Sequence, residues 1–121
     1  MRIAASLPAH DLERARAWYK QVLQVEPARE LDTGGLWYEI GGGDVVVYAS
    51  QFAGTNQATA LMIGVDDVEQ AVEAYRSRGA VLEDYDLEDF RTVDGIFTGP
   101  DGSKLAWMKD SEGNILGIGA L

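Results

Sequence analysis

Apolar positions change period several times along the chain, and these changes divide it into predicted helices and strands. Between residues 11 and 23, Ala15, Trp18, Tyr19 and Val22 recur at helical spacing. Extended patterns separated by glycine-rich turns predict strands at 2–7, 26–31, 36–40 and 44–50. The first half is therefore expected to fold in the order β-α-β-β-β.

The second half repeats this order. A strand is predicted at 58–65 and a helix at 67–78, and Gly79 supplies the left-handed residue that ends many helices. Further strands are predicted near 80–83, 93–98, 104–109 and 114–118, with hairpin turns at 99–102 and 111–114. The second half thus carries the same order with one additional strand.

A sequence repeat links the two halves. Segment 11–19 returns as segment 67–75, with Asp, Glu, Ala and Tyr at matching positions, and each copy follows a short apolar stretch. Two ordinary helix starts could coincide in this way, because Asp caps and first-turn Glu are common. Since the copies divide the chain almost evenly, we expect one domain, 1–121, built from modules at about 1–52 and 58–121 with pseudo-twofold symmetry.

The charge balance narrows the choice of partners. Twenty acidic residues against ten basic ones give a formal net charge of -10, which disfavours nucleic acid and anionic membranes. The chain has no cysteine, so disulfides and thiolate chemistry are excluded. No apolar run reaches the roughly 20 residues that cross a bilayer, and the first residues lack the apolar core of a signal peptide. We expect a cytoplasmic protein.

Three segments resemble a known family. They are 7–15 followed by Trp18-Tyr19, the central Gly64-Val65-Asp66-Asp67-Val68, and Lys109-Asp110-Ser111-Glu112-Gly113-Asn114. Together they resemble the vicinal oxygen chelate superfamily, which includes glyoxalase I, bleomycin-resistance proteins and ring-cleaving dioxygenases. The resemblance covers essentially the whole chain. It implies an α+β fold of two βαβββ modules whose mixed sheets form a curved cup, with helices on the convex face and a ligand or metal site inside.

The resemblance also implies where a metal would bind. In metal-dependent members, His or Glu ligands come from four strands, and the matching positions here are Ala4, Val46 or Val47, Ala60 and Gly117. None of these residues carries a donor, whereas a catalytic metal needs about three. We therefore expect no metal and no cofactor. The single histidine, His10, precedes the helix cap and is expected at the surface.

Small residues at the ligand positions would clear volume inside the cup. Such a cup would bury an apolar or aromatic small molecule, unless neighbouring aromatic side chains close the space into a packed core. Each aromatic candidate could instead pack between the sheet and a helix. The candidate ligand-binding residues are Ala4, Ser6, Trp37, Tyr48, Phe52, Ala60, Met62, Phe90, Trp107 and Gly117.

Three functions are consistent with the sequence. The favoured hypothesis is a metal-free small-molecule-binding protein of the bleomycin-resistance type. The first alternative is a metal-independent lyase or isomerase, for which Glu39, Tyr48 and Asp94 are the candidate catalytic residues. The second is a subunit that pairs with another protein. Superfamily members of this length usually pair, and open sheet edges favour being covered, so we expect a homodimer.

Overall fold

The computed structural model describes residues 1–121 and divides them into two compact units. The first unit holds residues 1–57 together with the turn Asp110–Asn114, and the second holds the rest of the second half, 58–109 and 115–121. The turn at 110–114 is thus packed with the first unit, although it connects two strands of the second.

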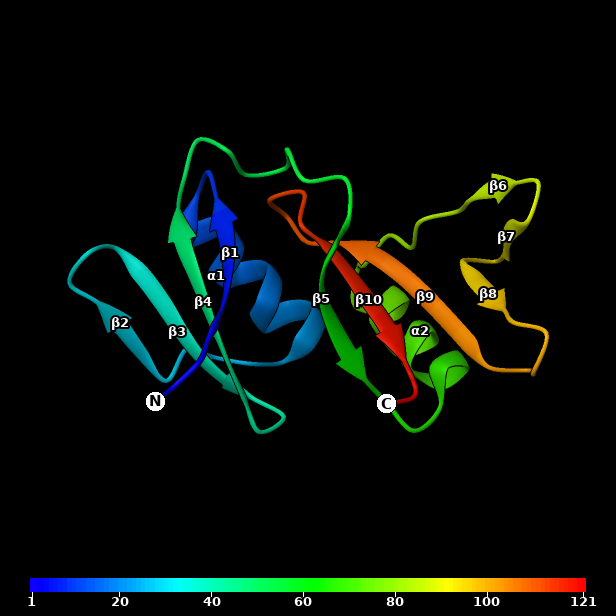
Figure 1. Ribbon diagram of the computed structural model, residues 1–121. Coiled ribbons are helices and arrows are strands. Elements are labelled where there is room, and N and C mark those ends of the chain that lie inside the picture. Colours follow the sequence, from blue (N-terminus) through cyan, green and yellow to red (C-terminus); the bar gives the residue numbers. More distant parts are fainter. The chain divides into compact units, whose positions relative to one another are not determined.

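The first unit is a four-stranded sheet with a helix packed on one face (Figure 1). Its elements are β1 (Ala5–Ala9), α1 (Leu12–Trp18), the π-helical turn η1 (Tyr19–Leu23), β2 (Arg29–Leu31), β3 (Gly35–Ile40) and β4 (Gly43–Ala49). The strand order is β1-β4-β3-β2, with β1 parallel to β4 and the other pairs antiparallel. This is the order β-α-β-β-β that the apolar pattern predicts.

Strand alternation gives this sheet a buried face and an open face. The buried side chains of the strands are Leu7, Ala9, Leu36, Tyr38, Val45 and Val47. They pack with Ala15, Tyr19 and Val22 of the helical segment, which are also buried. Ser6, Val46 and Trp37 therefore fall on the opposite, open face, where the register places them side by side on three neighbouring strands.

The second unit is a six-stranded sheet, also with one helix (Figure 1). Its elements are β5 (Thr59–Gly64), α2 (Val68–Ser77), β6 (Asp86–Leu87), β7 (Phe90–Val93), β8 (Ile96–Thr98), β9 (Lys104–Lys109) and β10 (Ile115–Gly119). The strand order is β5-β10-β9-β8-β7-β6, and β5 runs parallel to β10. Its core is formed by Val68, Val72, Ala106, Met108, Leu116 and Ile118.

The sequence repeat is a structural repeat. Asp11 and Asp67 are the N-caps of α1 and α2, with nearly identical backbone angles (φ -136, ψ 103 and φ -135, ψ 109). The carboxylate of Asp11 accepts from the N–H of Arg14 at 3.0 Å, and that of Asp67 from the N–H of Gln70 at 3.1 Å. The predicted α+β fold is confirmed, with two mixed, open curved sheets and one helix to each. The first unit follows the order βαβββ, whereas the second has five strands after its helix, of which the short β6 was not predicted.

Four predicted elements differ in detail. The first strand lies at Ala5–Ala9, not 2–7, and the helix predicted over 11–23 turns π-helical at Tyr19. The strand predicted at 80–83 is reduced to an isolated bridge between Leu82 and Met108. The strand predicted at 93–98 is a hairpin, because Asp94 and Gly95 both have positive φ (52 and 79) and reverse the chain between β7 and β8.

No helix in the structure combines the length and the apolar character that crossing a membrane requires.

Candidate ligand-binding site

The open face of the first unit carries several of the predicted site residues. Ser6 is exposed, and Ala4, half-buried, precedes β1 by one residue. Tyr48 lies opposite Pro8 and Gly35 and is 41% exposed. Ala4, Ser6 and Tyr48 thus lie on the same open face.

Trp37 dominates this face, but charged groups surround it. The guanidinium carbons of Arg2 and Arg29 lie 5.2 and 4.6 Å from its ring centroid, which is cation–π geometry. Its indole N–H donates to Asp44 at 3.3 Å. Arg2 also donates to Asp44 (2.8 Å) and Glu39 (2.9 Å), and the hydrogen bond from Arg2 lowers the pKa of Asp44. The ring is therefore part of a polar network.

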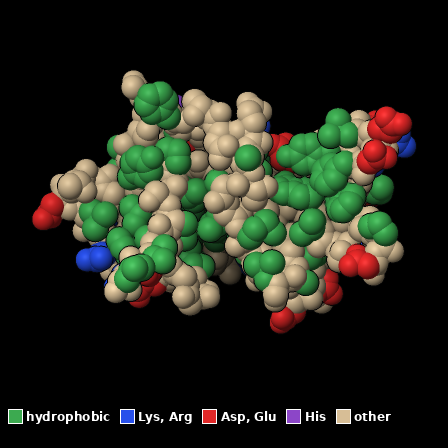
Figure 2. Space-filling model, viewed as in Figure 1, with side chains coloured by type: hydrophobic (Ala, Val, Ile, Leu, Met, Phe, Trp, Pro, Cys, Tyr) green, Lys and Arg blue, Asp and Glu red, His purple; other side chains and the backbone are tan.

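The open face of the second unit is different, because four aromatic rings gather on it. Tyr85, Phe90, Phe97 and Trp107 form this aromatic cluster. Phe90 stacks on Phe97 with centroids 4.6 Å apart and lies 5.2 Å from Trp107, and Tyr85 meets Trp107 edge-on at 5.7 Å. All four remain partly exposed. Figure 2 shows hydrophobic side chains gathered over the region of β7, β8 and β9, with acidic side chains at its outer edge.

Met62, Gly117 and Trp107 lie side by side in this sheet, on β5, β10 and β9. The indole N–H of Trp107 donates to Thr59 Oγ1 at 3.2 Å, so the ring reaches across β10. A Cβ built on Gly117 would lie 2.3 Å from the sulfur of Met62 and 3.2 Å from the methyl of Thr59. The space above Gly117 is thus filled by Met62, which is still 39% exposed.

A β-bulge affects the position of Ala60. Ile115 pairs with Thr59 but Leu116 pairs with Leu61, so Ala60 is the extra residue of β5. The bulge interrupts the alternation of side chains between the two faces of β5. The inference that Ala60 shares a face with Met62 therefore does not hold across it. Thr59 takes the place beside Gly117 instead. Ala60 itself is half-buried.

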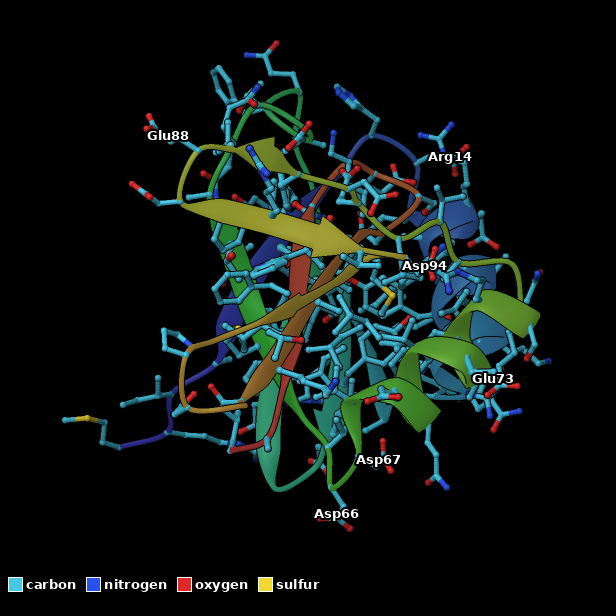
Figure 3. All side chains as sticks on the ribbon, turned by 90° about the vertical axis from the view of Figure 1, so that its right-hand side faces the viewer. Arg14, Asp66, Asp67, Glu73, Glu88 and Asp94 are labelled. Carbon is cyan, nitrogen blue, oxygen red and sulfur yellow. The ribbon has the colours of Figure 1, made fainter.

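The remaining sequence-predicted candidates lie away from the aromatic cluster or at its edge. Phe52 is 65% exposed in the turn after β4, and Phe90, expected on a loop at the rim, begins β7 inside the cluster. The side chain of Glu39 is 59% exposed, and its carboxylate is paired with Arg2. Asp94 occupies the turn between β7 and β8 (Figure 3), where its carbonyl accepts from Arg76 at 2.8 Å.

The donor set does not fit a metal ion. Val46 shares the open face with Trp37 and Ser6, whereas Val47 is fully buried toward the helix. The four positions that the resemblance assigns to metal ligands thus offer methyl groups, an isopropyl group and a glycine. No group of three or more His, Cys, Asp or Glu side chains is arranged to hold a metal. With Met62 over Gly117, the residues present favour packing instead of coordination.

The turn Asp110–Asn114 holds a buried polar network that sequence reasoning treated only as a hairpin. Asp110 accepts from the Tyr19 hydroxyl at 2.7 Å and from the amide of Asn114 at 2.9 Å. Burial alone would raise the pKa of Glu112, but hydrogen bonds from Arg14, the Asp11 N–H and Ser111 lower it to about 2. Every member of this network is hydrogen-bonded within the first unit, which indicates a structural role.

Sequence reasoning missed Tyr85, Phe97 and Thr59 as neighbours of Trp107. Alternation could have found Phe97, because it pairs with Leu105 and therefore lies on the same face as Trp107. Tyr85 precedes β6 and Thr59 precedes the bulge, and no periodic pattern marks either position.

Several solved structures share this fold. Among solved structures, lactoylglutathione lyase from Agrobacterium tumefaciens aligns with a TM-score of 0.73 at 18% identity, covering 99% of this chain and 92% of that one. A glyoxalase / bleomycin resistance protein from Catenulispora acidiphila aligns at 0.71 and 19% identity, covering 100% and 98%. TnmS3, an antibiotic binding protein from Streptomyces sp. CB03234, aligns at 0.65 and 18%, covering 99% and 94%.

The comparison with curated proteins found no match. The family model of the Glyoxalase/Bleomycin resistance protein/Dioxygenase superfamily, however, matches residues 3–107. The chain therefore belongs to this superfamily, as its resemblance to the vicinal oxygen chelate proteins predicts.

Proposed function

We propose that this protein binds an apolar or aromatic small molecule without a metal ion, on the open face of the second unit. The observation that carries the proposal is the aromatic cluster of Tyr85, Phe90, Phe97 and Trp107, whose rings contact one another yet remain partly exposed. Aromatic surfaces of this kind supply large contact areas to a flat ligand, with edge-on or stacked pairs each contributing about 0.5–1.5 kcal/mol.

The position of the cluster supports binding over a closed core. The fully buried side chains of the second unit, such as Met108 and Leu116, lie on the other face of the sheet from Trp107. The rings of the cluster are therefore not required to fill the space between sheet and helix. A neutral ligand is also easier to accommodate than an anion, because the whole chain carries a net charge of -10.

The alternative of a metal-independent lyase or isomerase receives less support. An acid or base in catalysis works best when it is held against substrate in a poorly hydrated site. Glu39 is largely exposed and ion-paired, Asp94 lies in an exposed turn, and Tyr48 is 41% exposed. A binding role also agrees with TnmS3, which has the same fold and is described as an antibiotic binding protein.

A fluorescence titration tests the proposal. N-phenyl-1-naphthylamine, a neutral aromatic dye that brightens in apolar surroundings, should bind the parent protein saturably, and to the same extent after dialysis against EDTA. Trp107→Ala should weaken binding roughly tenfold, the equivalent of losing one or two aromatic contacts.

Val93→Ala is the matched control. Val93 is 74% exposed on β7, where alternation places it on the opposite face from Phe90. Its truncation removes exposed apolar surface without touching the cluster, so dye affinity should stay at the parent value. Absence of saturable binding by the parent, or equal losses in the two variants, would rule out the aromatic cluster as the site.

A further inference from the structure

We infer that Met62 is a movable plug: its side chain covers the backbone at Gly117, beside Trp107 of the aromatic cluster, and a flat apolar ring binds there only when Met62 swings away. The inference rests on the proposed function and specifies how the site opens. It assigns Met62 a role in setting affinity, and it limits the ligand to one with a neutral ring thin enough to lie against bare backbone.

The floor of the plugged space is the backbone of β10. Gly117 and Gly119 both lack side chains, and alternation places them on the same face. A Cβ on Gly119 would lie 2.7 Å from Leu105 Cδ2 and 3.4 Å from Met62 Cε. Met62 therefore extends along the strand from Gly117 toward Gly119, and its thioether covers both glycines.

The walls of this space are mostly apolar. Trp107 stands on one side of Gly117 and its indole N–H is satisfied by Thr59, so it presents its ring system without an unpaired donor. Leu105 lies beside Gly119. None of these walls carries a charge, which favours a neutral ring over an ionised group because an unpaired charge is costly to bury.

Met62 is suited to move. Its unbranched side chain has three rotatable bonds and adapts its shape at low cost. It is 39% exposed, although its sulfur lies against the strand, so it can turn outward into solvent. A side chain held only by packing can be displaced by a ligand that packs better. Trp107, by contrast, would lose its hydrogen bond to Thr59 if it moved.

Three variants test the inference with the same dye, N-phenyl-1-naphthylamine. Met62→Ala removes the plug and should bind the dye at least fivefold more tightly than the parent. Gly117→Ala places a methyl group on the floor and should weaken binding, because the space is reduced from below. In the double variant, the added methyl group should cancel most of the gain in dye affinity that Met62→Ala gives.

Unfolding in urea supplies an independent readout of the contact. The Cβ of Gly117→Ala meets the Met62 sulfur at 2.3 Å, so this variant should lower the urea midpoint of the parent. The same substitution should lower the midpoint much less when Met62 is already alanine. Such coupling would show that the two positions share one space. The urea curves also identify any variant that does not fold.

The outcomes separate the inference from the proposed function. If Met62→Ala binds the dye no more tightly than the parent, while Trp107→Ala still weakens binding, the plug is wrong and the binding site stands. If the parent does not bind the dye, the proposed function fails, and the inference that rests on it fails with it. Val93→Ala again serves as the control for a general loss of exposed apolar surface.

Discussion

Tyr19 and Tyr38 show how differently two buried hydroxyls can contribute to one core. Both side chains are fully buried in the first unit, with ring centroids 5.4 Å apart. The hydroxyl of Tyr19 donates to Asp110 at 2.7 Å, whereas that of Tyr38 has no hydrogen-bond partner. Burial raises the pKa of both, that of Tyr38 to about 12, so each remains protonated at neutral pH.

The two tyrosines allow a prediction in which one variant serves as the control for the other. Tyr19→Phe should lower the free energy of unfolding by about 1.5–3 kcal/mol, because it removes a hydrogen bond to a buried carboxylate. Tyr38→Phe should leave it unchanged or raise it by about 1 kcal/mol, because it removes a buried polar atom that bonds to nothing. Urea unfolding at pH 7 measures both. Equal losses in the two variants would contradict the assigned hydrogen bonds.

Glu112 predicts a pH dependence of stability. Its carboxyl would titrate near 4.5 in the unfolded chain and titrates at about 2 in the folded one. The folded pKa is the lower one, so the contribution to stability is complete above pH 4.5 and is lost as the pH falls toward 2. The cost of Glu112→Gln should therefore be about 2 kcal/mol greater at pH 7 than at pH 3.

The comparison of Glu112→Gln with the parent isolates this carboxyl, because all the other acidic residues are present in both proteins. Free energies of unfolding at the two pH values supply the difference. A cost that is the same at pH 7 and pH 3 would mean that Glu112 is not held ionised by Arg14 and the Asp11 N–H.

At the scale of elements, the start of α2 provides a controlled test of the repeat. Asp67 caps the helix through the N–H of Gln70, whereas its neighbour Asp66 is exposed and precedes the cap (Figure 3). Asp67→Ala should cost about 1 kcal/mol of unfolding free energy, the usual value of an N-cap. Asp66→Ala should stay within about 0.5 kcal/mol of the parent, as surface substitutions do. Thermal unfolding of the two variants distinguishes the cap from a general effect of negative charge near the helix start.

Local signals predicted most elements correctly. The caps at Asp11 and Asp67 and the end of α2 at Gly79 depend on residues within a few positions, so the sequence identifies them directly. The turn at Asp94-Gly95 carried an equally local signal, but the apolar residues on both sides were interpreted as one strand. A two-residue turn leaves little room for a change of pattern, which explains the error.

The candidate site was harder to predict because it depends on contacts between strands. Alternation groups Trp37 with Glu39, and Leu105 with Trp107, but only the packing of α1 and α2 decides which group lies on the open face. The bulge at Ala60 shifts Thr59 into contact with Gly117, and no periodicity reveals such a shift. The glycine at position 117 indicated free space, whereas Met62 fills it.

At the scale of the whole molecule, exposed apolar side chains favour association between two copies of the chain, whereas their negative charge opposes it. The exposed large apolar side chains include Phe52, Val81, Leu87 and Val93, each more than 60% accessible. Where such side chains gather into a contiguous patch, they favour burial against another protein surface. The net charge of -10 opposes the approach of a second copy, and salt screens that repulsion.

We expect the apolar contribution to prevail and the protein to form a homodimer. Light scattering at tens of micromolar should give about twice the 13.2 kDa chain mass in 0.15 M salt. Because repulsion between two acidic chains is stronger when salt is low, the dimer should dissociate more readily at 0.01 M salt, where the screening length grows to about 30 Å. A mass near one chain at both salt concentrations would contradict the expectation. A dimer that is insensitive to salt would instead mean that the acidic residues lie far from the contact.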